Sequence, residues 1–174
     1  KAKDLLRQMA GYLEVGNSKG ANPSFNNLRR ESQLWMELGE WAKAEALLTK
    51  LRTKYTGVAE NQNDMDRYVL PDLGRALFMQ QKMVDAAGVL APLLEAKKAT
   101  FETTQLYARA LSGYAELVLD ENGKPRSVRT VPGVADKESL DKALGQFTQL
   151  LETLKAREGS FTPPWLAISA AFSK

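Results

Sequence analysis

The sequence contains no cysteine and no histidine. These two absences exclude disulfide bonds, zinc sites built on thiolate or imidazole ligands, thiol nucleophiles and any catalytic triad with an imidazole base. Carboxylates are therefore the acid–base groups that remain for a catalytic role. The absence of cysteine does not identify the compartment, since a helical repeat protein needs no disulfide in either redox environment.

Long apolar runs and a strong charge imbalance are also missing. No stretch approaches the roughly 20 apolar residues of a membrane-spanning helix, and no signal-peptide pattern is visible. The formal net charge is +3, and no segment interleaves aromatic residues with lysine and arginine, so a nucleic-acid partner is not expected. The 174 residues, 44% of them hydrophobic, predict one soluble domain with a sizeable core, whose localisation stays unknown.

A pattern of small and apolar residues returns along the chain. Gly74 lies between Leu73 and Leu77, and Ala108 takes the same place 34 residues later. Small residues at such places let two antiparallel helices touch, while larger neighbours fill the grooves. The expected partner helices repeat one spacing, as Ala44-x3-Leu48-x2-Leu51, Ala86-x3-Leu90-x2-Leu93 and Ala143-x3-Phe147-x2-Leu150.

These spacings resemble the tetratricopeptide repeat (TPR), a family of helix–turn–helix units. The run Trp165-x2-Ile168-Ser169-x2-Phe172 is similar to the family's Trp-x2-Leu-Gly-x2-Tyr opening. The resemblance implies an all-α fold, a right-handed α-solenoid (superhelix) of stacked antiparallel helix pairs, with about three full repeats and a partial fourth. The alternative is an ordinary helical bundle, although bundles show no fixed repeat period.

We therefore expect a single TPR-like domain over residues 1–174. Its predicted parts are an N-terminal helix at 1–16, repeat 1 at 23–56, repeat 2 at 64–98, repeat 3 at 101–157, and the start of repeat 4 or a C-terminal helix at 163–174. Residues 16–21 read as a flexible connector. Asn22 is the predicted N-cap of the next helix, with Pro23 at its first position.

Two joints are longer than the repeat needs. About eight extra residues around Val58 to Asp66 contain an Asn/Asp cluster, which predicts N-capping rather than a calcium loop, because the glycine and final glutamate of that loop are missing. Pro71 should kink the following helix or mark where it begins.

Repeat 3 has an inserted loop at 120–139, expected to be a surface excursion, with a partner-binding arm as the alternative. Its valines at 128, 131 and 134 indicate a short extended piece or hairpin.

The resemblance also implies a binding face, because first-helix residues line the concave surface in this family. Arginines at 29, 75 and 109 would form a row whose guanidinium groups can donate paired hydrogen bonds to carboxylates or backbone carbonyls. Aromatic and methionine side chains would lie beside this row. A solvated polar face is the alternative. The predicted partner-binding residues are Arg29, Gln33, Met36, Tyr68, Arg75, Phe78, Met79 and Arg109.

The family's carboxylate clamp, which grips the C-terminal acid of chaperones with lysine and asparagine, is not matched. Its places hold Arg29, Gln33, Asp72, Glu102 and Leu106, and two acids there would repel a terminal carboxylate. The expected function is therefore a non-catalytic scaffold that binds another protein or peptide, acidic or extended. The alternative is a structural or regulatory segment of a larger protein, which could itself be an enzyme.

Catalysis by this segment is not expected, and no cofactor or metal is predicted. The pairs Asp64 with Asp66 and Asp120 with Glu121 lie in polar loops, where a solvated carboxylate is the default. At the other end, residues 165–172 have almost no polar side, whereas repeat arrays normally finish with one. This predicts that a further helix follows, or that the end associates with a second molecule.

Overall fold

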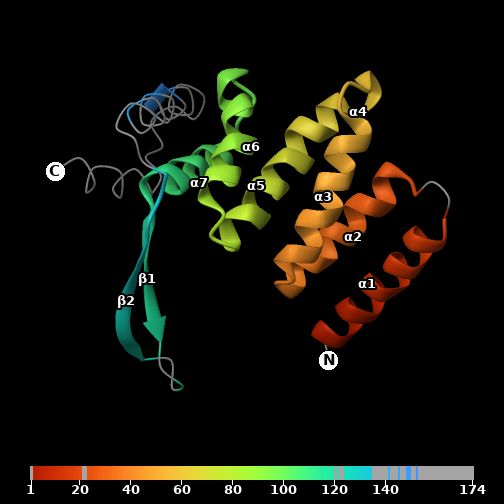
Figure 1. The fold of residues 1–174 in the computed structure, drawn as a ribbon, viewed down its shortest axis with the longest axis horizontal. Helices are drawn as coiled ribbons and strands as arrows, with labels where there is room; N and C mark the ends of the chain where they lie inside the picture. Colours follow the sequence, from red (N-terminus) through yellow and green to blue (C-terminus); the bar gives the residue numbers. More distant parts are fainter. Residues whose placement is uncertain are drawn as a thin grey trace.

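The computed structural model describes residues 2–20, 23–119, 121 and 124–134, and the single positions 141, 145, 148, 149 and 152. Within these ranges the chain is mainly helical, and consecutive helices pack against one another (Figure 1), which confirms the predicted fold class at that level. The elements are α1 (Ala2–Lys19), α2 (Phe25–Leu38), α3 (Trp41–Tyr55), α4 (Ala59–Asp64), the π-helix η1 (Met65–Val69), α5 (Leu70–Met79), α6 (Met83–Glu95), α7 (Phe101–Ser112), β1 (Tyr114–Leu119) and β2 (Pro125–Val131).

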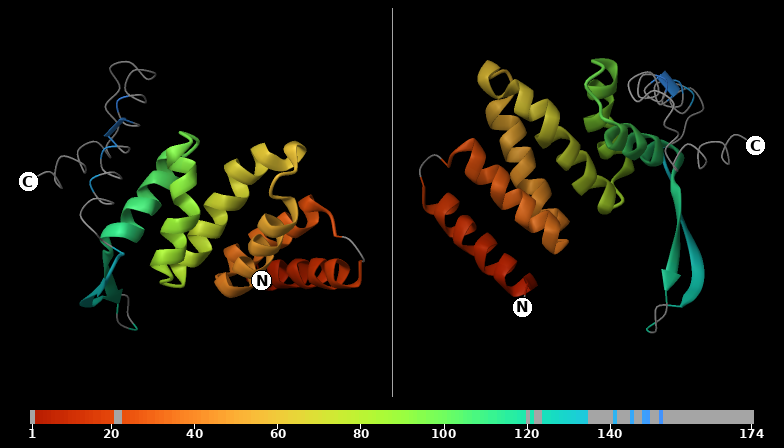
Figure 2. Two further views of the ribbon diagram at one scale, coloured as in Figure 1. Left: turned by 45° about the horizontal axis from the view of Figure 1, so that its top comes forward. Right: turned by 180° about the vertical axis from the view of Figure 1, so that it is seen from behind.

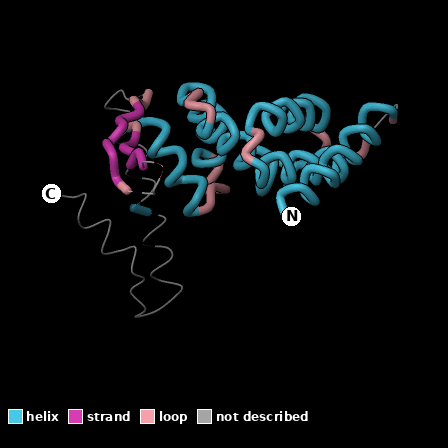
Figure 3. Tube along the Cα trace, turned by 90° about the horizontal axis from the view of Figure 1, so that it is seen from below, coloured by secondary structure: helices cyan, strands magenta, loops and turns pink. Residues whose placement is uncertain are grey.

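The helices form a row in which each packs on its neighbours. α2 pairs with α3 and α5 pairs with α6, while α3 contacts α5 and α6 contacts α7. The two pairs lie side by side in both views of Figure 2, with α1 outside α2. Figure 3 shows the strands at the end of the row opposite to α1. A short helix pair cannot bury its apolar stripe alone, so this stacking supplies the shared core.

Part of the core lies where α5 packs on α6. Gly74 is buried in α5, and a Cβ built on it would lie 2.6 Å from the Cγ of Leu90 in α6. Ala86 is fully buried in the same helix pair. The prediction that position 74 is a crossing point is therefore confirmed. The largest fully buried side chains of the described ranges are Leu28, Leu34, Leu48, Leu51, Leu73, Leu90, Leu93 and Val69.

The start of α2 differs from the sequence-based prediction. α1 continues through Lys19, so residues 16–19 are helical rather than a flexible connector. The N-cap of α2 is Ser24, whose Oγ accepts a hydrogen bond from the Asn27 amide at 3.2 Å. The prediction of an Asn22 cap was wrong because Ser24 is an equally good cap and places Phe25 in the core. α2 ends at Gly39, whose φ of 79° is the left-handed conformation that glycine adopts readily.

The joint between the α2–α3 and α5–α6 pairs is helical and is held in place by polar contacts of Asp66. The predicted N-capping by its Asn/Asp cluster is absent, since Val58 precedes α4 and makes no side-chain cap. Asp66 is instead buried in η1, where it accepts a hydrogen bond from Gln62 at 2.8 Å and pairs with Lys98 at 2.5 Å. α5 begins at Leu70, one residue before Pro71. Pro71 therefore marks the start of this helix, which is one of the two outcomes predicted for it. A proline in the first turn of a helix costs no backbone hydrogen bond, because the amides there have no partner within the helix.

A β-hairpin interrupts the helical array after α7. Gly113, with a φ of 76°, ends the helix, and β1 then pairs antiparallel with β2, so that Tyr114 lies opposite Val131. The extended piece predicted from the valines is confirmed, but the interruption begins at Gly113, earlier than the expected loop at 120–139. Val131 is buried, and the Val134 amide donates to the Ala110 carbonyl at 3.1 Å. The hairpin base is therefore attached to α7.

Several predictions fall outside the described residues. They are the second helix of repeat 3 with Ala143, Phe147 and Leu150, and the segment 163–174 with its proposed association surface at 165–172. Within the described ranges, a search for a helix of membrane-spanning length and apolarity finds none.

We predict opposite effects for two glycines of the α5–α6 pair. Gly74→Ala should lower the free energy of unfolding by about 1–3 kcal/mol, because the new methyl group would overlap the fully buried Leu90. Gly88→Ala should raise it by about 0.5–1 kcal/mol, because that exposed helical position has no atom near its Cβ and gains helix propensity. Urea titration followed by circular dichroism measures both. Equal effects at the two positions would contradict the assigned crossing.

Candidate functional site

The three predicted arginines lie on successive elements of one face. Arg29 comes from α2, Arg75 from α5 and Arg109 from α7. Contacts between side chains join these elements. We call this surface, made by α2, η1–α5 and α7, the first-helix face.

Arg29 rests on an aromatic ring of the neighbouring unit. Its guanidinium carbon lies 3.8 Å from the centroid of the Tyr68 ring in η1, a cation–π contact. The Nε atom of Arg29 is buried and has no hydrogen-bond partner in the described part of the chain. A buried N–H donor without an acceptor is unfavourable.

Asp72 lies in the same charged group, one turn before Arg75 on α5. Burial raises the pKa of its carboxyl above the ordinary value of 3.8, and the positive charges of Arg75 and Arg29 offset this only in part. The Asp72 carboxylate therefore limits how much net positive charge the two arginines present to a ligand.

Arg75 links α5 to α7. Its Nη2 atom donates to the Oε2 atom of Glu102 at 3.2 Å, and the Glu102 side chain is 78% exposed. An exposed ion pair of this kind contributes about 0–1 kcal/mol, because both groups are well solvated when apart. Exchange of the Glu102 carboxylate for one from another molecule therefore has a low energetic cost.

A shallow pocket of about 250 Å³ lies between η1–α5 and α7. It brings together Tyr68 and Arg75 of the predicted binding set with Asp72, Glu102 and Leu106, which had been matched to places of the family's clamp. The complete lining is Arg67, Tyr68, Pro71, Asp72, Arg75, Thr100, Glu102, Thr103 and Leu106. Two acids and two arginines thus line one pocket, a pattern unlike an all-basic carboxylate clamp.

Arg109 extends the first-helix face toward the hairpin. Its guanidinium lies 4.8 Å from the centroid of the Tyr114 ring and 5.3 Å from that of Phe78. The two rings are stacked, with centroids 5.0 Å apart. Phe78 is 3% exposed, so it acts on this surface by supporting Tyr114 and Arg109 rather than by offering its own area.

The other predicted binding residues, Gln33, Met36 and Met79, differ in how exposed they are. Gln33 and Met36 are half-buried on α2, and Met36 packs against the core. Met79, at the end of α5, is 48% exposed. Tyr114 was missed because Gly113 was read as part of a continuing helix. The glycine and the β-branched and aromatic residues after it were the available signal.

Asp66, one of the two carboxylates considered for catalysis at the joint, is paired with Lys98. No group of three or more potential metal ligands occurs among the residues that the structure describes. The first-helix face instead offers hydrogen-bond donors, one charged pocket and aromatic surface.

We predict that Asp72→Asn changes the pH dependence of stability. Because folding raises the pKa of Asp72, its contribution to stability is most favourable below pH 3.8 and is lost as the pH rises through the raised value. The melting temperature of Asp72→Asn relative to wild type should therefore increase between pH 3.5 and pH 7, by about 1–4 °C. Glu37→Gln, at an exposed position of α2, is the control. A difference that falls or stays flat over this range would contradict the assignment.

Comparison with models of protein families, with curated proteins and with solved structures gave no match. The functional interpretation therefore depends on the geometry of the first-helix face.

Proposed function

We propose that the chain is a non-catalytic interaction scaffold that binds an extended polypeptide along the first-helix face. In this proposal the helix pairs belong to a TPR-like, right-handed α-solenoid, and the face is its concave side. The observation that supports it most is the row of Arg29, Arg75 and Arg109 on three successive first helices, each in contact with an aromatic ring or a carboxylate of another element.

The proposed binding uses exchange at Arg75. A guanidinium has five N–H donors in a planar fork, and the recorded hydrogen bond to Glu102 uses one nitrogen. An acidic side chain of the ligand could bind Arg75 while Glu102 turns into solvent. When the Arg29 guanidinium turns outward, its Nε–H, which is buried and has no partner within the described residues, donates a second hydrogen bond to a ligand carbonyl or carboxylate oxygen.

The pocket charges favour a particular kind of ligand. Asp72 and Glu102 balance the two arginines of the pocket, Arg67 and Arg75, so a run of consecutive acids would meet repulsion from Asp72 as well as attraction. An extended peptide with separated acidic side chains fits better, since its backbone amides can donate to Asp72. Tyr114, beside Arg109, adds an aromatic contact of the type enriched at binding surfaces.

The alternative is a structural or regulatory role within a larger protein. It is favoured by the outer side of α1, where Leu5, Met9, Tyr12 and Val15 are exposed, Tyr12 to 80%. Four large apolar residues on one exposed helix indicate a surface that another helix or protein covers. The two roles are compatible, because this surface lies on α1 and the first-helix face does not include α1.

We predict that Arg75→Glu/Arg109→Glu abolishes polypeptide binding, lowering partner recovery by about tenfold or more. Both side chains are exposed, so the fold should be retained. The matched control is Arg30→Glu/Arg52→Glu, which makes the same charge change at exposed positions of α2 and α3. Immobilised variants would be compared by quantitative mass spectrometry of the proteins retained from a lysate. Equal losses in both variants would show nonspecific charge attraction and contradict the proposed face.

Glu102→Gln should have the opposite effect. Removing the internal carboxylate leaves Arg75 unpaired, so the variant should retain acidic partners more strongly, by about two- to fivefold. The measurement is the same recovery assay at two salt concentrations. Weaker recovery in Glu102→Gln would mean that Glu102 contacts the ligand itself, and the exchange mechanism would be wrong.

A further inference from the structure

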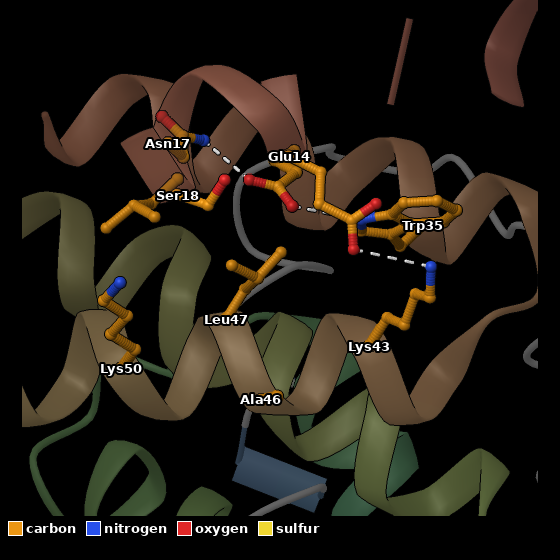
Figure 4. Close-up of a pocket in the computed structure, with 10 residues that line it drawn as sticks. Glu14, Asn17, Ser18, Trp35, Lys43, Ala46, Leu47 and Lys50 are labelled. Carbon is orange, nitrogen blue, oxygen red and sulfur yellow. Dashed lines mark hydrogen bonds and ion pairs between the residues drawn. The ribbon is translucent and has the colours of Figure 1, made fainter. Parts of the chain in front are cut away.

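A second cavity lies away from the first-helix face, between α1 and α3. It has a volume of about 240 Å³, and Figure 4 shows side chains of α1 and α3 facing each other across it. α2 supplies its inner wall through Leu28, Glu31 and Trp35. The charged residues that line the cavity are Glu14, Glu31, Lys43 and Lys50.

Glu31 is the least expected member of this group, because it is a carboxylate only 2% exposed. It accepts hydrogen bonds from the Asn17 side-chain amide at 2.6 Å and from the Trp35 indole N–H at 3.3 Å. Both donors are neutral. A carboxylate has about four acceptor positions, and a buried one is favourable only when it is well paired. The Glu31 carboxylate thus has acceptor capacity for a cation.

The cavity already holds one ammonium group. The Nζ atom of Lys43 lies 3.9 Å from the centroid of a Trp35 ring, a cation–π contact. The same atom lies 3.6 Å from Oε1 of Glu14, and both side chains are about half exposed. At that distance the ion pair is longer than a hydrogen bond, so Lys43 is held loosely. An aromatic face with carboxylates beside it is the usual environment for recognising an organic cation.

We propose that this cavity binds a primary ammonium group from outside the chain, with Lys43 as its internal occupant. The incoming group would take the place of the Lys43 ammonium over Trp35, between Glu14 and Glu31, while the long Lys43 side chain turns into solvent. Removal of Lys43 leaves two carboxylates against Lys50, a net charge that favours a single ammonium. The shared chemistry fits either a free alkylamine or the side chain of a lysine in a peptide.

Competition with Lys43 sets the expected affinities. A tethered occupant acts at a high effective concentration, so wild type should bind an added amine weakly. Lys43→Ala should bind it about tenfold more tightly or better, because the Trp35 ring is then uncovered and Glu14 has lost its ion-pair partner. The site itself is unchanged by that substitution, since Lys43 is half exposed.

The test is an NMR titration that follows the Trp35 indole N–H resonance, which reports directly on the hydrogen bond to Glu31. The probes are n-butylammonium chloride and the peptide acetyl-Gly-Lys-Gly-amide, with sodium chloride at equal ionic strength as reference. The same peptide acetylated on its lysine Nζ is the neutral control. Saturable shifts with butylammonium alone would support a free amine as ligand, and shifts with the lysine peptide would support a protein ligand.

The variants are built on Lys43→Ala. Adding Glu14→Gln or Glu31→Gln should each weaken probe binding about fivefold or more, whereas adding Glu37→Gln, on the exposed side of α2, should change nothing. Glu14 is half exposed, so its substitution tests the site even if Glu31→Gln disturbs the packing of α1. The proposal is overturned if Lys43→Ala shows no saturable shift, if the acetylated peptide binds equally well, or if Glu14→Gln leaves the affinity unchanged.

Discussion

The close approach of α5 to α6 at Gly74 is the constraint on which the rest of the structure depends. Leu90 lies against the Gly74 backbone, and α5 also contacts α3, η1 and α7. Any larger residue at position 74 would separate α5 from α6. Gly74 therefore sets the spacing of the α5–α6 pair, and the first-helix face depends on that packing.

The first-helix face is formed by residues that this packing leaves at the surface. Once Gly74 and Leu77 face inward on α5, helical spacing brings Asp72 and Arg75 to the surface, within reach of Arg29 on one side and Glu102 on the other. The cavity at α1 has a different basis. There a buried carboxylate, Glu31, holds α1 to α2 through Asn17. One site is thus a consequence of apolar packing and the other of a polar contact.

The sequence allowed the repeated helix pairs to be predicted, but not the features that depend on single caps, turns and neighbours. The spacing of small and apolar residues predicted the helix pairs, the crossing at Gly74 and the elements that hold the three arginines, because helical periodicity is strong over such lengths. The cap at Ser24 and the strand after Gly113 were missed, since a one-residue choice of cap or turn is decided by tertiary packing. The buried Glu31 and the raised pKa of Asp72 also depend on neighbours distant in sequence, which periodicity alone cannot reveal.

The most direct test of the account is where a bound polypeptide touches the molecule. A photo-reactive amino acid placed at Gln105, which is exposed on α7 between Glu102 and Arg109, should form covalent adducts with partner polypeptides. The same amino acid at Val84, which is 69% exposed on the second helix α6, should form none. Adducts from position 105 alone are the predicted result. Adducts from position 84 alone would contradict the account, because they would place the binding surface on the opposite helices of the array.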